Sequence, residues 1–109
     1  MSAPQRIQRR RTKGWRMPEN TIYVGRGSRW GNPHAVGSTG YTKGGQEMTH
    51  THETAARAYR HWIKTSLVGA ILARESLDLL RGKNLMCWCP LDQPCHADVL
   101  LELANQETP

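Results

Sequence analysis

Phenylalanine is absent from this sequence of 109 residues, and no long run of apolar residues occurs in it. A helix that spans a membrane needs about 20 predominantly apolar residues in a row, and no segment approaches that length. The N-terminus also lacks the apolar stretch of a secretory signal peptide. We therefore expect a cytoplasmic protein with no membrane partner. Without phenylalanine, the four tryptophans and the aliphatic residues of the second half must supply most of the core.

Cysteine is scarce as well, with only Cys87, Cys89 and Cys95 in the chain. A disulfide scaffold normally has an even number of cysteines and belongs to an oxidising compartment, so this count argues against one. Metal binding and thiol chemistry are the alternatives.

Acidic residues are missing from the first 16 positions, where six basic side chains lie. From residue 17 onward nine basic residues balance nine acidic ones, so the net charge of +6 belongs to the N-terminal segment. We predict a basic, flexible tail over residues 1–16 and a single domain over residues 17–109. Such a tail either keeps the protein soluble or binds the phosphates of a nucleic acid. The candidate nucleic-acid contacts are Arg6, Arg9, Arg10, Arg11, Lys13 and Arg16.

The rest of the chain alternates between strand and helix patterns. Strands are predicted over residues 21–24 and 85–89, and a glycine-rich loop over residues 25–48 follows the first strand. One helix is expected from Thr51 with a bend at Gly69, a second helix is expected to end at residues 81–82, and a third to start near Cys95. This order predicts a small α/β domain with packed helices and a short sheet in which the two strands are parallel.

The two predicted strands are each followed by a loop that carries chemistry. In open α/β sheets, ligands bind outside the carboxyl ends of the strands, so the two loops are expected to converge on one site. Glycines let the backbone approach a phosphate, and the first loop has arginines with no acid beside them. His50 and His52 flank the predicted start of a helix and are expected to face solvent. The candidate ligand-binding residues are Gly25, Arg26, Gly27, Ser28, Arg29, Trp30, Gly31, Asn32 and His34.

The second loop ends in a Cys-His pair, for which two interpretations stay open. Cys87, Cys89, Cys95 and His96 form a legitimate set of zinc ligands, although an extended strand would hold the Cβ atoms of Cys87 and Cys89 roughly 7 Å apart. Alternatively, the start of a helix lowers the pKa of a thiol and binds anions. Cys95 would then act as a nucleophile and His96 as a general acid or base, with Asp98 beside them.

Four segments together resemble a known family, the domain of unknown function 4326, which occurs in short phage and bacterial proteins. They include the Cys-x-Cys of Cys87 and Cys89 and the Cys-His pair at Cys95, and the likeness covers about residues 14–105. Ala97 stands where the family usually has glycine after the Cys-His pair, and a weaker, local similarity links that helix to domain of unknown function 488. The resemblance implies no activity, because none is established for the family. The four segments span residues 23–33, 59–62, 80–89 and 95–100.

Three hypotheses about function follow from these patterns. The first is that the protein binds a nucleotide or a related phosphate-bearing ligand between residues 25–34 and the start of the last helix, and acts on it. The second is a zinc-stabilised accessory protein that binds nucleic acid. The third is a phage factor that binds a host protein in the host cytoplasm.

Overall fold

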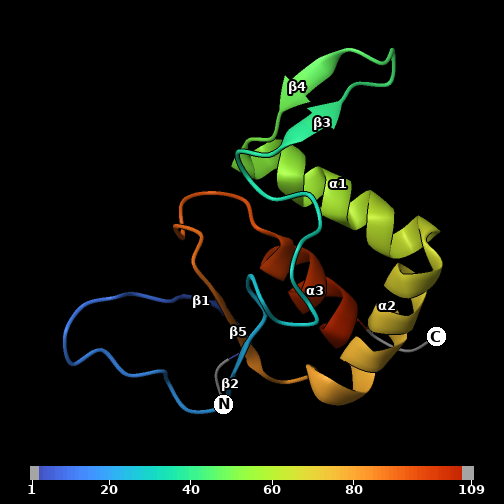
Figure 1. Cartoon of the computed structure of the whole chain (residues 1–109). Coiled ribbons are helices and arrows are strands. Elements are labelled where there is room, and N and C mark those ends of the chain that lie inside the picture. The colour runs from blue at the N-terminus through green and yellow to red at the C-terminus, as the bar shows by residue number, and fades with distance from the viewer. Residues whose placement is uncertain (1–2, 107–109) are drawn as a thin grey trace.

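The computed structural model describes residues 3–106 and shows a small α/β domain (Figure 1). One sheet has three parallel strands in the order β1-β5-β2, and a separate hairpin has two antiparallel strands. The strands are β1 (Arg6–Gln8), β2 (Thr21–Tyr23), β3 (Thr39–Tyr41), β4 (Glu47–Thr49) and β5 (Asn84–Cys87), and the helices are α1 (His52–Thr65), α2 (Leu67–Leu79) and α3 (His96–Asn105). The predicted fold class is therefore confirmed. No helix among the described residues is long and apolar enough to cross a membrane.

The central strand of the sheet is β5, which pairs in parallel with β1 on one side and with β2 on the other. Leu85, Met86 and Cys87 are all buried in it. A strand that is buried on both faces consists of consecutive apolar residues and does not alternate apolar with polar ones. These three residues follow the consecutive pattern. The predicted parallel pairing of the two recognised strands is correct.

The third strand of this sheet, β1, lies inside the segment that was expected to be a flexible tail. Its residues Arg6–Gln8 pair with Leu85–Cys87, the amide of Leu85 donates to the Gln5 carbonyl at 3.1 Å, and that of Arg9 donates to the Cys87 carbonyl at 2.7 Å. Backbone hydrogen bonds along the free edge of β5 hold it, and these need no apolar side chains. A strand of three residues with one apolar member leaves no periodicity to detect.

The predicted irregular region over residues 25–48 also contains regular structure. Strands β3 and β4 pair with Gly40 opposite Met48, and the turn between them is closed where the Thr42 amide donates to the Gln46 carbonyl at 2.8 Å. Gly45 adopts a φ of 82° there, a conformation that favours glycine. The hairpin projects from the start of α1, away from the sheet (Figure 1).

Helix α1 starts where the sequence predicted. The side chain of Thr51 accepts a hydrogen bond from the Thr54 amide at 3.2 Å, which caps the helix. The chain then turns at Ser66 rather than at Gly69: Ser66 ends α1 and also caps α2 by accepting from the Gly69 amide at 2.8 Å. The capping serine therefore sets the position at which one helix ends and the next begins.

Trp30 and Tyr59 join the loop after β2 to the core. Trp30 is only 4% exposed, and the buried hydroxyl of Tyr59 donates to the Trp30 carbonyl at 3.0 Å. Residues of α3, among them Val99 and Leu100, pack in the same cluster. This packing holds the loop after β2 beside the start of α3.

Candidate functional site

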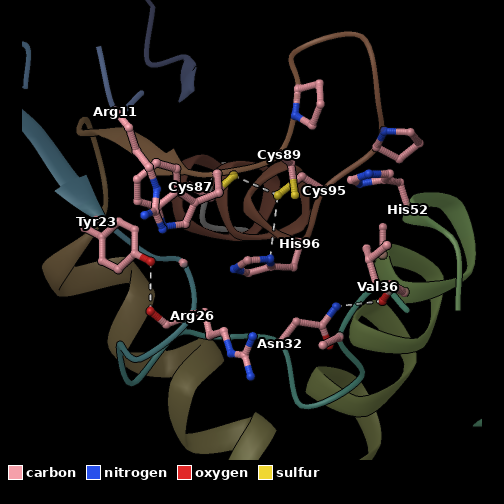
Figure 2. Close-up of a pocket in the computed structure, with 17 residues that line it drawn as sticks. Arg11, Tyr23, Arg26, Asn32, Val36, His52, Cys87, Cys89, Cys95 and His96 are labelled. Atoms are coloured by element: carbon pink, nitrogen blue, oxygen red, sulfur yellow. Dashed lines mark hydrogen bonds between the residues drawn. The ribbon is translucent and has the colours of Figure 1, made fainter. Parts of the chain in front are cut away.

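A pocket of about 530 Å³ lies where the loop after β2 meets the loop after β5 (Figure 2). Gly25, Arg26 and Asn32 line it from the first loop, and Cys89 and Cys95 line it from the second. The two loops converge because β2 and β5 are parallel neighbours, so that their carboxyl ends meet at one edge of the sheet.

Three cysteines gather on the inner wall of this pocket. The sulfur atoms of Cys87, Cys89 and Cys95 all lie within 4.8 Å of one another, and the sulfurs of Cys87 and Cys95 are 2.9 Å apart. The wide separation of the Cβ atoms of Cys87 and Cys89 that an extended strand would impose does not apply, because β5 ends at Cys87 and Cys89 lies beyond it. Sulfur ligands at about 2.3 Å from a tetrahedral zinc are roughly 3.8 Å apart. The three cysteines can therefore hold a metal ion.

Of the three thiols in this cluster, Cys95 is the one whose pKa is lowered. Hydrogen bonds with Cys87 and Cys89, together with contacts to His96, lower the pKa of the Cys95 thiol. Hydrogen bonding with Cys89, and then with Cys95, raises the pKa of the Cys87 thiol. Cys95 also stands at the start of α3, where backbone N–H groups favour an anion.

His96 sits between the cluster and the loop after β2. Its Nε2 lies 2.7 Å from the Val24 carbonyl, to which it donates, and its Nδ1 lies 3.6 Å from the Cys95 sulfur. Burial disfavours the charged ring, but Cys95 and then Val24 more than offset this, so the pKa of His96 is raised. His96 does not belong to the set of donor atoms within 4.8 Å that the three cysteines form.

Asp98, predicted as a catalytic residue, does not line the pocket. Its carboxylate accepts from the Cys95 amide at 3.0 Å and forms an ion pair with Arg6 Nε at 3.3 Å. A carboxylate in the third position of a helix reaches back to the cap residue, which satisfies an otherwise free N–H group. Asp98 therefore positions the start of α3.

Arg6, predicted as a nucleic-acid contact, has a side chain only 8% exposed. Its guanidinium donates to the carbonyls of Leu91 at 2.9 Å and Gln93 at 2.6 Å. Burial opposes the charge, but Asp98 and then Cys95 raise the pKa of Arg6 above its ordinary value. Arg6 thus fastens the loop after β5 and brings a positive charge close to Cys95.

The residues predicted to bind a ligand in the loop after β2 separate into two groups. Gly25, Arg26 and Asn32 line the pocket, whereas Arg29 pairs with Glu75 on α2. The others shape the loop or fill the core. Ser28 donates to the Gly25 carbonyl, and Gly27 has a φ of 90°. A Cβ at Gly31 would lie 3.2 Å from the Gly25 carbonyl oxygen, so glycine fits closely there. Trp30 is in the core, and the His34 ring lies 5.7 Å from that of His50.

His52 is a pocket residue that the sequence reasoning missed. It lines the pocket together with Ala55 and Ala56, and its Nδ1 is buried without a hydrogen-bond partner among the described residues. The sequence did contain a signal for this placement. His52 lies three residues before the buried Ala55, and residues three apart share one face of a helix. His50, also expected to face solvent, is 8% exposed and bonds Thr54 at 3.1 Å.

The remaining basic residues of the N-terminal segment follow β1. Arg9 lies between two rings, with its guanidinium carbon 5.0 Å from the centre of Tyr23 and 4.9 Å from that of Trp88. Arg11 lies 4.9 Å from the Trp88 centre and also lines the pocket. Arg10, Lys13 and Arg16 are exposed.

The parallel sheet, the pocket at its carboxyl edge and the thiol cluster define a small α/β protein with a candidate ligand-binding site. Residues 7–106 match the model of the family described as domain of unknown function (DUF4326), so the chain belongs to this family. The match begins within β1 and includes both loops of the pocket. No curated protein and no solved structure matches the chain.

Proposed function

We propose that the protein binds a phosphate-bearing small molecule, such as a nucleotide, in the pocket between the two loops. The observation that carries this proposal is that the guanidinium groups of Arg11 and Arg26 line the pocket, whereas no Asp or Glu does among the described residues. These two guanidinium groups outweigh the one lining thiol whose pKa is lowered, that of Cys95, so the lining favours an anion. A volume of about 530 Å³ lies in the range of roughly 300–1,000 Å³ that is usual for small-molecule sites.

The groups around the pocket have different roles in this proposal. Asn32 is already engaged, since it donates to the Ala55 carbonyl and accepts from the His34 amide, so it serves as a fixed wall. Arg26 is exposed and His52 Nδ1 has no partner, so these two offer hydrogen bonds to an incoming anion. In a reaction, Cys95 and His96 are the groups that would meet the bound ligand.

Thermal unfolding in the presence of a nucleotide panel, ADP-ribose and inorganic phosphate tests the proposal. A ligand at 100 times its Kd stabilises the protein by about 2.7 kcal/mol, which is a clear rise in Tm. Arg26→Ala should weaken binding about tenfold, because one charge-assisted hydrogen bond is lost. Arg74→Ala, an exposed arginine of α2, is the matched control. The proposal is wrong if no member of the panel changes the Tm.

A second candidate function rests on the three cysteine sulfurs within 4.8 Å of one another. In this proposal they hold zinc, which links the end of β5 to the start of α3 and stabilises the domain for binding nucleic acid. Metal analysis of the purified protein should find about one zinc per chain, and Cys89→Ser should lose it. Zinc-free protein that gains no Tm on addition of zinc would contradict this candidate.

A further inference from the structure

A second hollow adjoins the pocket on the side of the N-terminal segment. It has a volume of about 500 Å³ and is lined by Gln8, Arg9, Arg10, Arg11, Thr12 and Trp88. Arg11 and Trp88 line both hollows, so the two adjoin at these side chains. We call this second hollow the arginine groove.

The arginine groove is fixed in place by stacked side chains. Tyr23, Arg9, Trp88 and Arg11 alternate aromatic ring and guanidinium, with separations of 4.9 to 5.0 Å between each guanidinium carbon and the neighbouring ring centre. Each such contact contributes about 0.5–1 kcal/mol at an exposed site. The cations are therefore held along the groove before any ligand arrives.

The cations of this surface have no carboxylate partners within the described part of the chain. The ion pairs there are made by Arg6, Arg29, Arg57 and Arg60, none of which lines the groove. Arg10 bonds only weakly, to Gln8 at 3.4 Å, and the first 16 residues contain no acid. Positive charge that the protein leaves uncompensated in a groove attracts an extended polyanion.

Helix α1 forms the wall of the pocket that lies opposite Arg11. Arg11 and His52 lie on opposite sides of the pocket (Figure 2), and Ala55 and Ala56 of α1 line it together with His52. A chain that enters past Arg11 cannot continue through the helix.

We propose that the ligand is the end of a single-stranded nucleic acid, with its terminal nucleotide in the pocket and its preceding phosphates along the arginine groove. This inference rests on the proposed binding of a phosphate-bearing molecule in the pocket and names its class. Arg10 lines the groove, Lys13 and Arg16 follow it in the chain as exposed cations, and flat guanidinium groups offer stacking faces for the bases of the strand.

Fluorescence anisotropy with a labelled ten-nucleotide strand, as DNA and as RNA, tests the inference, with the mononucleotide and a circle of the same sequence as competitors. The linear strand should bind at least about tenfold more tightly than the mononucleotide, because it adds phosphate contacts. The circle, which has no end, should compete poorly. Arg10→Ala with Lys13→Ala should lower the salt slope of strand binding by about 1.4 and leave mononucleotide binding unchanged. Arg74→Ala should change neither.

The outcomes separate this inference from the function on which it rests. Equal affinity for strand and mononucleotide overturns the inference and leaves the binding of small phosphate ligands standing. Equal competition by the circle overturns the role of the strand end. Failure of both the strand and the mononucleotide to bind overturns the inference and the proposed function together.

Discussion

Arg6 and Asp98 tie the edge of the sheet to the start of α3. Asp98→Ala removes the ion pair at 3.3 Å and the hydrogen bond to the Cys95 amide, and it leaves the buried Arg6 without its carboxylate. We expect the free energy of unfolding to fall by about 2 kcal/mol, since Asp98 is about half exposed and the pair is only partly desolvated. Urea denaturation measures this change.

Asp78→Ala is the control for that prediction, because Asp78 is an exposed acid of α2. It should alter stability by less than about 0.5 kcal/mol. If Asp98→Ala left stability unchanged and abolished ligand binding, this prediction would be wrong and Asp98 would act directly on the ligand.

Tyr59 gives the protein a dependence on alkaline pH. Burial, and then Cys95, raise the pKa of its hydroxyl above the ordinary value of 10.0. Above pH 10 the unfolded chain loses this proton while the folded chain keeps it, so stability falls as pH rises, by up to about 1.4 kcal/mol per pH unit.

Tyr59→Phe should remove this contribution and flatten the loss of stability between pH 9 and 11 in urea unfolding. At neutral pH it should cost about 1 kcal/mol, because the Trp30 carbonyl loses its donor. Tyr41→Phe is the control, since Tyr41 is 70% exposed. If the free energy of unfolding fell equally steeply with pH in the wild type and in Tyr59→Phe, the pKa of Tyr59 would not be raised in the folded protein.

At the scale of elements, the contact between α1 and α2 depends on Gly69. A Cβ at this position would lie 2.5 Å from Ile63 Cα and 2.5 Å from the Trp62 carbonyl oxygen, both in the backbone of α1. Gly69→Ala should therefore destabilise the protein by about 2 kcal/mol, although alanine normally favours a helix over glycine. Thermal unfolding checks the sign. Gly44→Ala, with nothing within 4 Å of its Cβ, should be neutral or slightly stabilising.

The elements also differ in how far the sequence predicts them. The helices are long enough for apolar spacing to show, so Ala55, Tyr59 and Ile63 mark the buried face of α1. Strands β1, β3 and β4 have three residues each, and their pairing partners rather than their own patterns define them. The break between the two helices lies at Ser66 and not at the predicted Gly69, because two capping hydrogen bonds of Ser66 end α1 and start α2.

For the molecule as a whole, residues 5–9 of the N-terminal segment are part of the fold. Deletion of residues 1–9 removes β1, its bonds to β5 and the side chain of Arg6 that holds the loop after β5. The free energy of unfolding should drop by at least about 3 kcal/mol, because several hydrogen bonds and a buried charge pair are lost together. Deletion of residues 1–4 keeps the Gln5 carbonyl that accepts from Leu85, and it should be tolerated. Circular dichroism melts distinguish the two, and equal stability would contradict a structural β1.

The sequence by itself determined the α/β class, the parallel strands and the convergence of two loops, because apolar patterns and the chemistry of strand ends are local features. It also singled out Cys87, Cys89 and Cys95, whose residue type limits what they can do. Only the tertiary structure decided that Asp98 pairs with Arg6, that Trp30 and Arg29 do not line the pocket, and that Arg11 does. Those assignments depend on which side chains far apart in the sequence pack together, and the spacing of residue types along the sequence does not reveal such contacts.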